Sequence, residues 1–384
     1  MSFFKKDRTR KSSRGSSSSH SSNDSDIQND GSEGRGNGSW LQATSSLRPT
    51  NGTSKISSGR LLGGSTHRSD DDSTETRQNE DNAARAASSK LHSIECQKHP
   101  GHKEFIPVGK LQPHHLPPPY RTENWVRFLR LKGEETVHIS VSYTSNNRPE
   151  ELGFQDLRGT TKVRIGSGTA FIMNMENTED CYCGEIEGAH KVSGSFKVMT
   201  VAHVVFDDAE AQSTFIKFFL DDDSDSTAVV TARGERVSHI DIQRNRSVIE
   251  CRTHDLTLFQ RLSNSRNERM RLIQNSLSTE VNHEPMVVLI SHPHGMSKCV
   301  SIGRLLAIQE EGDVKTTQEG VELIGCFLAY DTPTCPGAGG GSINLIGKGE
   351  VCYAFAPHCA SHSDGKNTSG LGWTKYVKSL ELRR

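Results

Sequence analysis

The sequence has no long uninterrupted apolar segment, and only 32% of its 384 residues are hydrophobic. A membrane-spanning helix needs about 20 consecutive apolar residues, so we expect no membrane anchor. The first residues also lack the apolar core of a signal peptide. Aromatic residues make up only 6% of the chain. This scarcity of large apolar side chains predicts that part of the chain cannot bury enough surface to fold.

The chain also lacks a net charge of either sign, because 46 basic residues face 47 acidic ones. No basic excess points to a nucleic-acid partner, and we expect none. The nine cysteines are an odd number in a chain without a recognisable secretion signal. That count fits a reducing compartment better than a disulfide framework. We therefore expect an intracellular protein, either cytoplasmic or nuclear.

Composition divides the chain into a polar beginning and a folded remainder. Residues 1–94 are rich in Ser, Gly, Asn and Asp, which predicts a disordered tail. Residues 95–157 form a lead-in segment in which we expect one or two strands. From residue 158 onward, short apolar and β-branched runs alternate with turn residues, for example at residues 163–172 and 321–330. This pattern predicts an all-β domain.

One of these runs ends in a histidine with catalytic potential. Residues 198–206 predict a strand that ends near His203, beside an acidic turn. An imidazole at such a place is suited to act as a general base near neutral pH. Asp255 and a glycine-rich turn at residues 335–342 follow later in the chain. The order histidine, aspartate, glycine-rich turn is that of chymotrypsin-like double-barrel proteases.

Three segments resemble motifs of the trypsin-like serine peptidases of the intracellular type. Residues 198–203 resemble the T-A-A-H motif, residues 254–258 the D-I-A-L motif, and residues 335–342 the G-D-S-G-G-P turn. Residues 166–169 and 291–295 are similar to the G-S-G and G-H-P segments of intracellular members. The order and spacing of these segments carry the resemblance.

The resemblance implies a chymotrypsin-like all-β fold for residues 158–384. It consists of two six-stranded antiparallel β-barrels and a short C-terminal helix at about residues 373–382. The first barrel is expected at about residues 158–262 and the second at about residues 284–384. An apolar pattern with helical spacing at residues 267–278 predicts an amphipathic connector between them.

The resemblance also assigns roles to single residues. His203 would be the base and Asp255 the residue that orients it, while the nucleophilic serine falls on Gly339. A glycine has no side-chain oxygen and cannot form an acyl-enzyme. The backbone N–H groups of Gly337 and Gly339 would still shape an oxyanion hole that binds carbonyls or carboxylates.

These roles lead to the hypothesis of a catalytically impaired protease homologue, a pseudoprotease, that needs no cofactor. Its partner would be a peptide or protein bound in the cleft between the barrels. The strand carrying Ala354, Phe355 and Ala356 is expected to bind an extended peptide through main-chain hydrogen bonds.

Two alternatives remain open at this point. An active serine endopeptidase would use Ser342 as the nucleophile, or would have serine at position 339 in the true locus. A shift of register to Ser342 puts Ile343 where the motif has a small residue. A zinc-stabilised adaptor is the third class, and it rests on Cys/His clusters such as Cys96, His99 and His102. No fourth ligand is evident in the sequence, so no metal is assigned.

Overall fold

The structure is a computed structural model that describes residues 95–174, 194–277, 284–316, 322–347, 350–362 and 364–375. Residues 1–94 lie outside this part, so the disordered tail stays a prediction. Within the described residues, no helix is long and apolar enough to cross a membrane.

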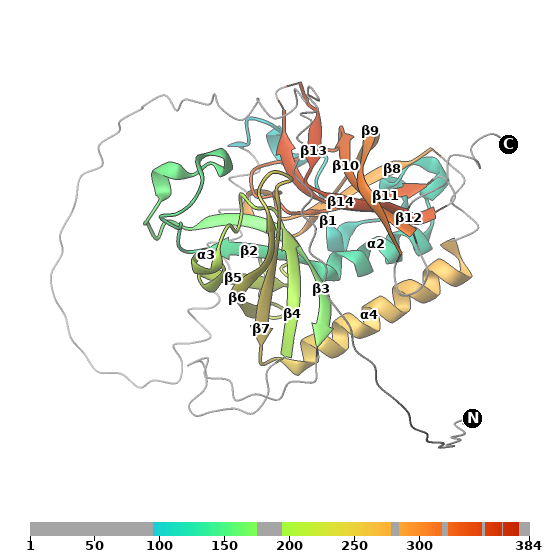
Figure 1. The fold of residues 1–384 in the computed structure, drawn as a ribbon. Coiled ribbons are helices and arrows are strands. Elements are labelled where there is room, and N and C mark those ends of the chain that lie inside the picture. The colour runs from blue at the N-terminus through green and yellow to red at the C-terminus, as the bar shows by residue number, and fades with distance from the viewer. Residues whose placement is uncertain are drawn as a thin grey trace, which may run out of the picture. The chain divides into compact units, whose positions relative to one another are not determined.

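Six strands close the first barrel, in the order β2-β3-β4-β7-β6-β5 (Figure 1). Every neighbouring pair in this barrel is antiparallel. The strands are β2 (Thr136–Val141), β3 (Arg164–Asn174), β4 (Gly194–Thr200), β5 (Thr214–Phe218), β6 (Val230–Asp241) and β7 (Arg246–Thr253). The barrel therefore begins with β2, which lies before the expected boundary at residue 158.

The second sheet contains eight strands in the order β1-β9-β8-β11-β12-β13-β10-β14, and the pairings β9–β10 and β12–β14 close it into a ring. Its strands are β1 (Ile106–Pro107), β8 (Met286–Ser291), β9 (Cys299–Thr316), β10 (Glu322–Tyr330), β11 (Ser342–Gly347), β12 (Glu350–Ser361), β13 (Asn367–Ser369) and β14 (Gly372–Lys375). A closed barrel beside a second ring confirms the chymotrypsin-like all-β fold class. Strand β14 occupies the place where the closing helix was expected to begin, and residues 376–384 lie outside the described part.

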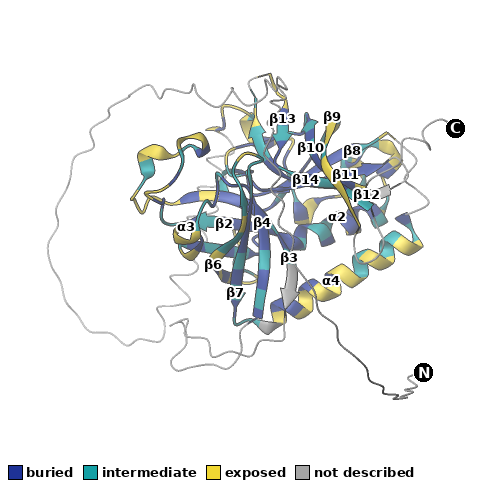
Figure 2. Ribbon diagram, in the orientation of Figure 1, coloured by how far each residue is buried: buried dark blue, intermediate teal, exposed yellow. Residues whose placement is uncertain are grey.

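Both faces of β8 are buried, which explains its unbroken apolar sequence. Val287 and Leu289 point into the core of the second ring, whereas Val288 and Ile290 pack on the other side against a cluster built around Trp125. Strand β5 of the first barrel buries one face only, because its fully buried residues Ile216 and Phe218 alternate with half-buried residues. Figure 2 shows that the strands are mostly buried, whereas the outer side of helix α4 is exposed.

The helices cover the outside of the barrels. They are α2 (Glu123–Glu135), α3 (Asp208–Gln212) and α4 (Leu256–Asn275), with 3-10 turns η1 (Pro100–His102), η2 (Val108–Lys110), η3 (Pro113–His115), η4 (Pro118–Tyr120), η5 (Glu150–Leu152), η6 (Gln155–Leu157) and η8 (Pro293–Gly295). Helix α2 packs against α4. It buries Trp125, Phe128 and Leu129, whose i, i+3, i+4 spacing forms one apolar face. The connector helix α4 is present but begins well before the expected residue 267.

A buried ionic cluster fixes the loop that follows β4. The Glu210 carboxylate is fully buried and accepts hydrogen bonds from Arg148 Nη1 at 2.8 and 2.9 Å. Arg164 Nη2 lies 3.0 Å from the same carboxylate. Arg148 also donates to the carbonyl oxygen of His203, and Arg164 Nη1 donates to that of Val204 at 2.9 Å. The two guanidinium groups therefore hold the backbone that carries His203.

Removing the charge at the centre of this cluster is expected to destabilise the protein strongly. The substitution Glu210→Gln leaves two buried guanidinium groups without a counter-charge, so the free energy of unfolding should fall by about 3–5 kcal/mol in urea denaturation. Glu250→Gln is the matched control, because Glu250 pairs with Lys197 and Arg236 at a more exposed place. Its effect should stay below about 1 kcal/mol. Similar losses in both variants would contradict this account of the cluster.

Candidate functional site

His203 lies in the loop directly after β4, where the apolar residues Val201, Ala202 and Val205 anchor the backbone in the core of the first barrel. Arg148 and Arg164 donate hydrogen bonds to the carbonyl groups of His203 and Val204. The backbone position of the imidazole is therefore fixed by packing and by buried charge together. The structure places this histidine just after the end of the strand, as the sequence predicted.

Asn245, in the turn between β6 and β7, makes two hydrogen bonds with His203. The His203 N–H donates to Asn245 Oδ1 at 3.1 Å, and Asn245 Nδ2 lies 3.0 Å from His203 Nδ1. Because the amide oxygen is held by a backbone donor, the NH₂ group must face the ring. Nδ1 then accepts a hydrogen bond, and the proton of the neutral imidazole is on Nε2. The second amide hydrogen points to Cys359, whose Sγ lies 2.9 Å from Nδ2.

The environment keeps this imidazole neutral. The pKa of His203 is lowered to about 4, mainly by burial, and the nearby guanidinium groups of Arg148 and Arg164 act in the same direction. At neutral pH the ring is uncharged, with Nε2–H as a donor. A catalytic base needs the opposite tautomer, in which Nε2 has its lone pair free for the nucleophile's proton.

Asp255 does not fill the orienting role that the resemblance implied. Its carboxylate caps the N-terminus of α4, where Oδ1 accepts hydrogen bonds from the N–H groups of Thr257 and Leu258 and from the Thr257 hydroxyl. The partner of His203 Nδ1 is Asn245 instead. The D-I-A-L resemblance led to Asp255 because an aspartate just before an apolar run matches that motif, but here it is a helix cap.

The glycine-rich turn at residues 335–341 is tied to the first barrel by Ser167 of β3. The Ser167 N–H donates to the carbonyl of Gly339 at 2.7 Å, and its Oγ donates to that of Gly337 at 2.9 Å. The Gly340 N–H donates to the carbonyl of His358 at 2.8 Å. These bonds fix the turn against His203 across the junction of the two barrels.

Gly339 stands directly against the imidazole. A Cβ atom placed on Gly339 would lie 2.8 Å from His203 Nε2, closer than real Cβ contacts allow. The position that would present a nucleophile to His203 is therefore 339. The imidazole therefore lies where a side chain at position 339 would need space.

Two backbone donors of this turn lack an acceptor. Within the described residues, the N–H groups of Gly337 and Gly339 donate to no protein group. Gly337 has φ +91°, and an added Cβ would lie 2.7 Å from the carbonyl oxygen of His292, so only glycine fits there. The prediction that these two N–H groups bind an oxygen ligand stays a prediction.

Ser342 is the first residue of β11 and is buried, with its backbone paired between β8 and β12. Its Oγ accepts a hydrogen bond from Asn344 Nδ2 at 3.1 Å. This placement gives no support to Ser342 as the nucleophile that faces His203, because position 339 has that place.

The strand expected to bind a peptide has no free edge. Ala354, Phe355 and Ala356 pair with β11 on one side, and Ala354 and Phe355 pair with β14 on the other. The sequence showed that these residues form a strand but could not show that both of its edges are used. Ala354 and Phe355 therefore leave no edge for an added peptide strand, and a role of this strand in binding stays a prediction.

The contact between Tyr330 and His358 was not predicted from the sequence. The Tyr330 hydroxyl lies 2.5 Å from His358 Nδ1, and both side chains are buried. Burial lowers the pKa of His358 to about 3, with His203 and Lys98 adding to the effect. A second neutral imidazole therefore lies beside the site. No local motif marks either residue, because they approach each other only when β10 and β12 enter the same sheet.

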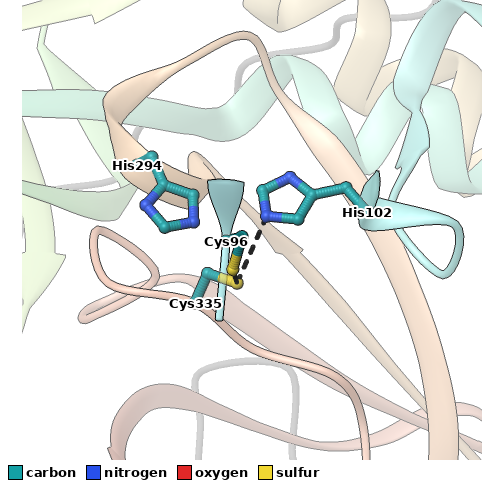
Figure 3. Close-up of side chains that lie close together, drawn as sticks. All are labelled: Cys96, His102, His294 and Cys335. Atoms are coloured by element: carbon teal, nitrogen blue, oxygen red, sulfur yellow. Dashed lines mark hydrogen bonds between the residues drawn. The ribbon is translucent and has the colours of Figure 1, made fainter. Parts of the chain in front are cut away.

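The structure also gathers part of the Cys/His motif that the sequence singled out. Cys96 and His102 lie close to His294 and Cys335, and the four possible ligand atoms are within 4.8 Å of one another (Figure 3). His99 instead faces Glu104, with 3.1 Å between Nδ1 and Oε2. The two missing ligands were invisible in the sequence because they belong to distant segments of the second ring.

Comparison with known proteins adds little to this geometry. The chain matches no protein-family model and no curated protein. Among solved structures, the active form of the Rv3671c protease from M. tuberculosis is 13% identical with a TM-score of 0.32, over 67% of this chain and 82% of that chain. The HtrA-type protease AlgW with tripeptide is 13% identical with a TM-score of 0.30, over 67% of this chain and 61% of that chain. The fold assignment rests on the strand pairing alone.

Proposed function

We propose that this chain is a pseudoprotease: a chymotrypsin-like double barrel that binds peptide or protein segments beside Gly339 and does not hydrolyse them. The observation that carries the proposal is the closeness of position 339 to His203, because a Cβ atom added there would lie 2.8 Å from Nε2. The residue in contact with the histidine has no side-chain oxygen, so no acyl-enzyme can form there.

The tautomer of His203 supports the same proposal independently. A serine at position 339 would meet an Nε2 that already carries a proton, because Asn245 donates to Nδ1. In serine proteases, replacing the orienting aspartate by asparagine lowers kcat by about 10⁴ for this reason. The site therefore lacks two parts of the catalytic apparatus.

The same arrangement favours binding of an oxygen ligand. His203 Nε2–H and the N–H groups of Gly337 and Gly339 are donors without a competing acceptor in this turn. Donor-only sites of this kind bind carbonyl or carboxylate oxygens. We therefore infer that the ligand is a peptide segment with a carbonyl or a C-terminal carboxylate placed at the turn.

The loss of catalysis is tested by labelling with a fluorophosphonate probe, which needs only an activated serine. The unaltered protein is expected to stay unlabelled, and Gly339→Ser to react slowly. Adding Asn245→Asp to Gly339→Ser should accelerate labelling by roughly 10³–10⁴-fold, because the carboxylate restores the base tautomer. His203→Ala in the double variant should abolish this gain. Labelling of the unaltered protein that disappears in Ser342→Ala would overturn the proposal.

Binding is tested separately with an array of unrelated peptides that end in a free carboxylate or an amide. The unaltered protein should retain a subset of the peptides, and Gly339→Ala should weaken their binding at least tenfold, because its Cβ displaces the imidazole. Gly109→Ala is the matched control, since no atom lies within 4 Å of an added Cβ there. Equal binding by the unaltered protein and both variants would contradict a ligand site at Gly339.

A further inference from the structure

We propose that Cys96, His102, His294 and Cys335 bind a structural zinc ion. Two thiols and two imidazoles form the donor set that zinc takes in tetrahedral structural sites. The four residues come from the lead-in segment, from the loop η8 (Pro293–Gly295) and from the glycine-rich turn, and their side chains converge on one point (Figure 3). No part of the proposed peptide-binding function is needed for this inference.

Two of the separations between the ligand atoms match those of a zinc site. Tetrahedral zinc with Zn–S of about 2.3 Å and Zn–N of about 2.05 Å places sulfur atoms about 3.8 Å apart and a sulfur and a nitrogen about 3.6 Å apart. Cys96 Sγ and Cys335 Sγ are 3.6 Å apart, and Cys335 Sγ and His102 Nε2 are 3.5 Å apart. A disulfide needs an S–S distance of about 2.05 Å, so the two cysteines are not bonded to each other.

The surroundings suit bound metal. Cys96, His102 and Cys335 are at most 9% exposed, and Phe105 packs beside the two cysteines. The His99 N–H donates to Cys96 Sγ at 3.4 Å, which would stabilise a thiolate there. Zinc would replace the two thiol protons, which leave to solvent, and the resulting site has no net charge.

Two of the four residues have strained backbones. His102 has φ 47° and His294 has φ 54°, both in the left-handed region that non-glycine residues rarely adopt. Such strain persists only where the surroundings enforce it, and it is common at functional sites. Aiming both imidazoles at the cysteines provides a reason for the strain.

The proposed zinc would connect the lead-in segment to the turn that contains Gly339. Cys335 precedes Gly339 by four residues, and the His294 N–H donates to the Pro336 carbonyl at 2.6 Å. The lead-in segment reaches the same place through Lys98, whose Nζ donates to Thr334 Oγ1 at 2.9 Å. Metal binding would thus fix the segment before the turn from two sides.

The test is the metal content of the full chain purified under reducing conditions without chelator. Inductively coupled plasma mass spectrometry should find about one zinc per chain, and X-ray absorption should find two sulfur ligands at about 2.3 Å and two nitrogens at about 2.0 Å. Cys335→Ser and His294→Ala should each lower the zinc content at least tenfold.

Two matched controls separate ligation from general damage. His99→Ala removes the remaining member of the sequence motif, and Cys299→Ser removes a cysteine that packs against the same cluster. Both should keep about one zinc per chain. The proposal is overturned if the unaltered protein neither contains nor takes up one equivalent of zinc. A different set of zinc ligands in the X-ray absorption spectrum would also overturn the proposal. So would a Cys96–Cys335 disulfide in the purified protein.

Discussion

The hydrogen bond from Asn245 to His203 Nδ1 decides the chemistry of the junction between the barrels. It selects the tautomer with the proton on Nε2, and the backbone bond from His203 to Asn245 Oδ1 prevents the amide from turning over. In a protease of this fold a carboxylate at this place leaves Nε2 free to accept a proton. With asparagine, the same histidine becomes a donor, and the glycine at 339 fits the proposed role, in which the site binds a ligand and does not react with it.

The remaining contacts of the junction serve the same arrangement. Arg148 and Arg164, which both pair with Glu210, hold the backbone beside His203, and their positive charge helps to keep the imidazole neutral. On the opposite side, Ser167 holds the glycine-rich turn by two hydrogen bonds. The histidine and the turn are thus each supported by polar groups that are largely buried, so their approach does not depend on a catalytic serine.

Local patterns in the sequence were sufficient to predict the fold class and to locate two residues of the site, His203 and Gly339. The apolar run ending at His203 and the glycines around Gly339 mark a strand end and a tight turn, and both are local features. No local sequence pattern identifies Asn245, because its role depends on the pairing of β6 with β7. Asp255 was misassigned because a helix cap and a catalytic aspartate look alike before an apolar run.

The proton on His203 is the most direct test of this account. Long-range ¹H–¹⁵N NMR of the labelled protein distinguishes the two neutral tautomers, and a His203→Gln variant assigns the signal. The account predicts a protonated Nε2, an unprotonated Nδ1, and a ring that stays neutral as the pH falls until it titrates near pH 4. A proton on Nδ1 at neutral pH, or titration near the ordinary value of about 6.5, would contradict it.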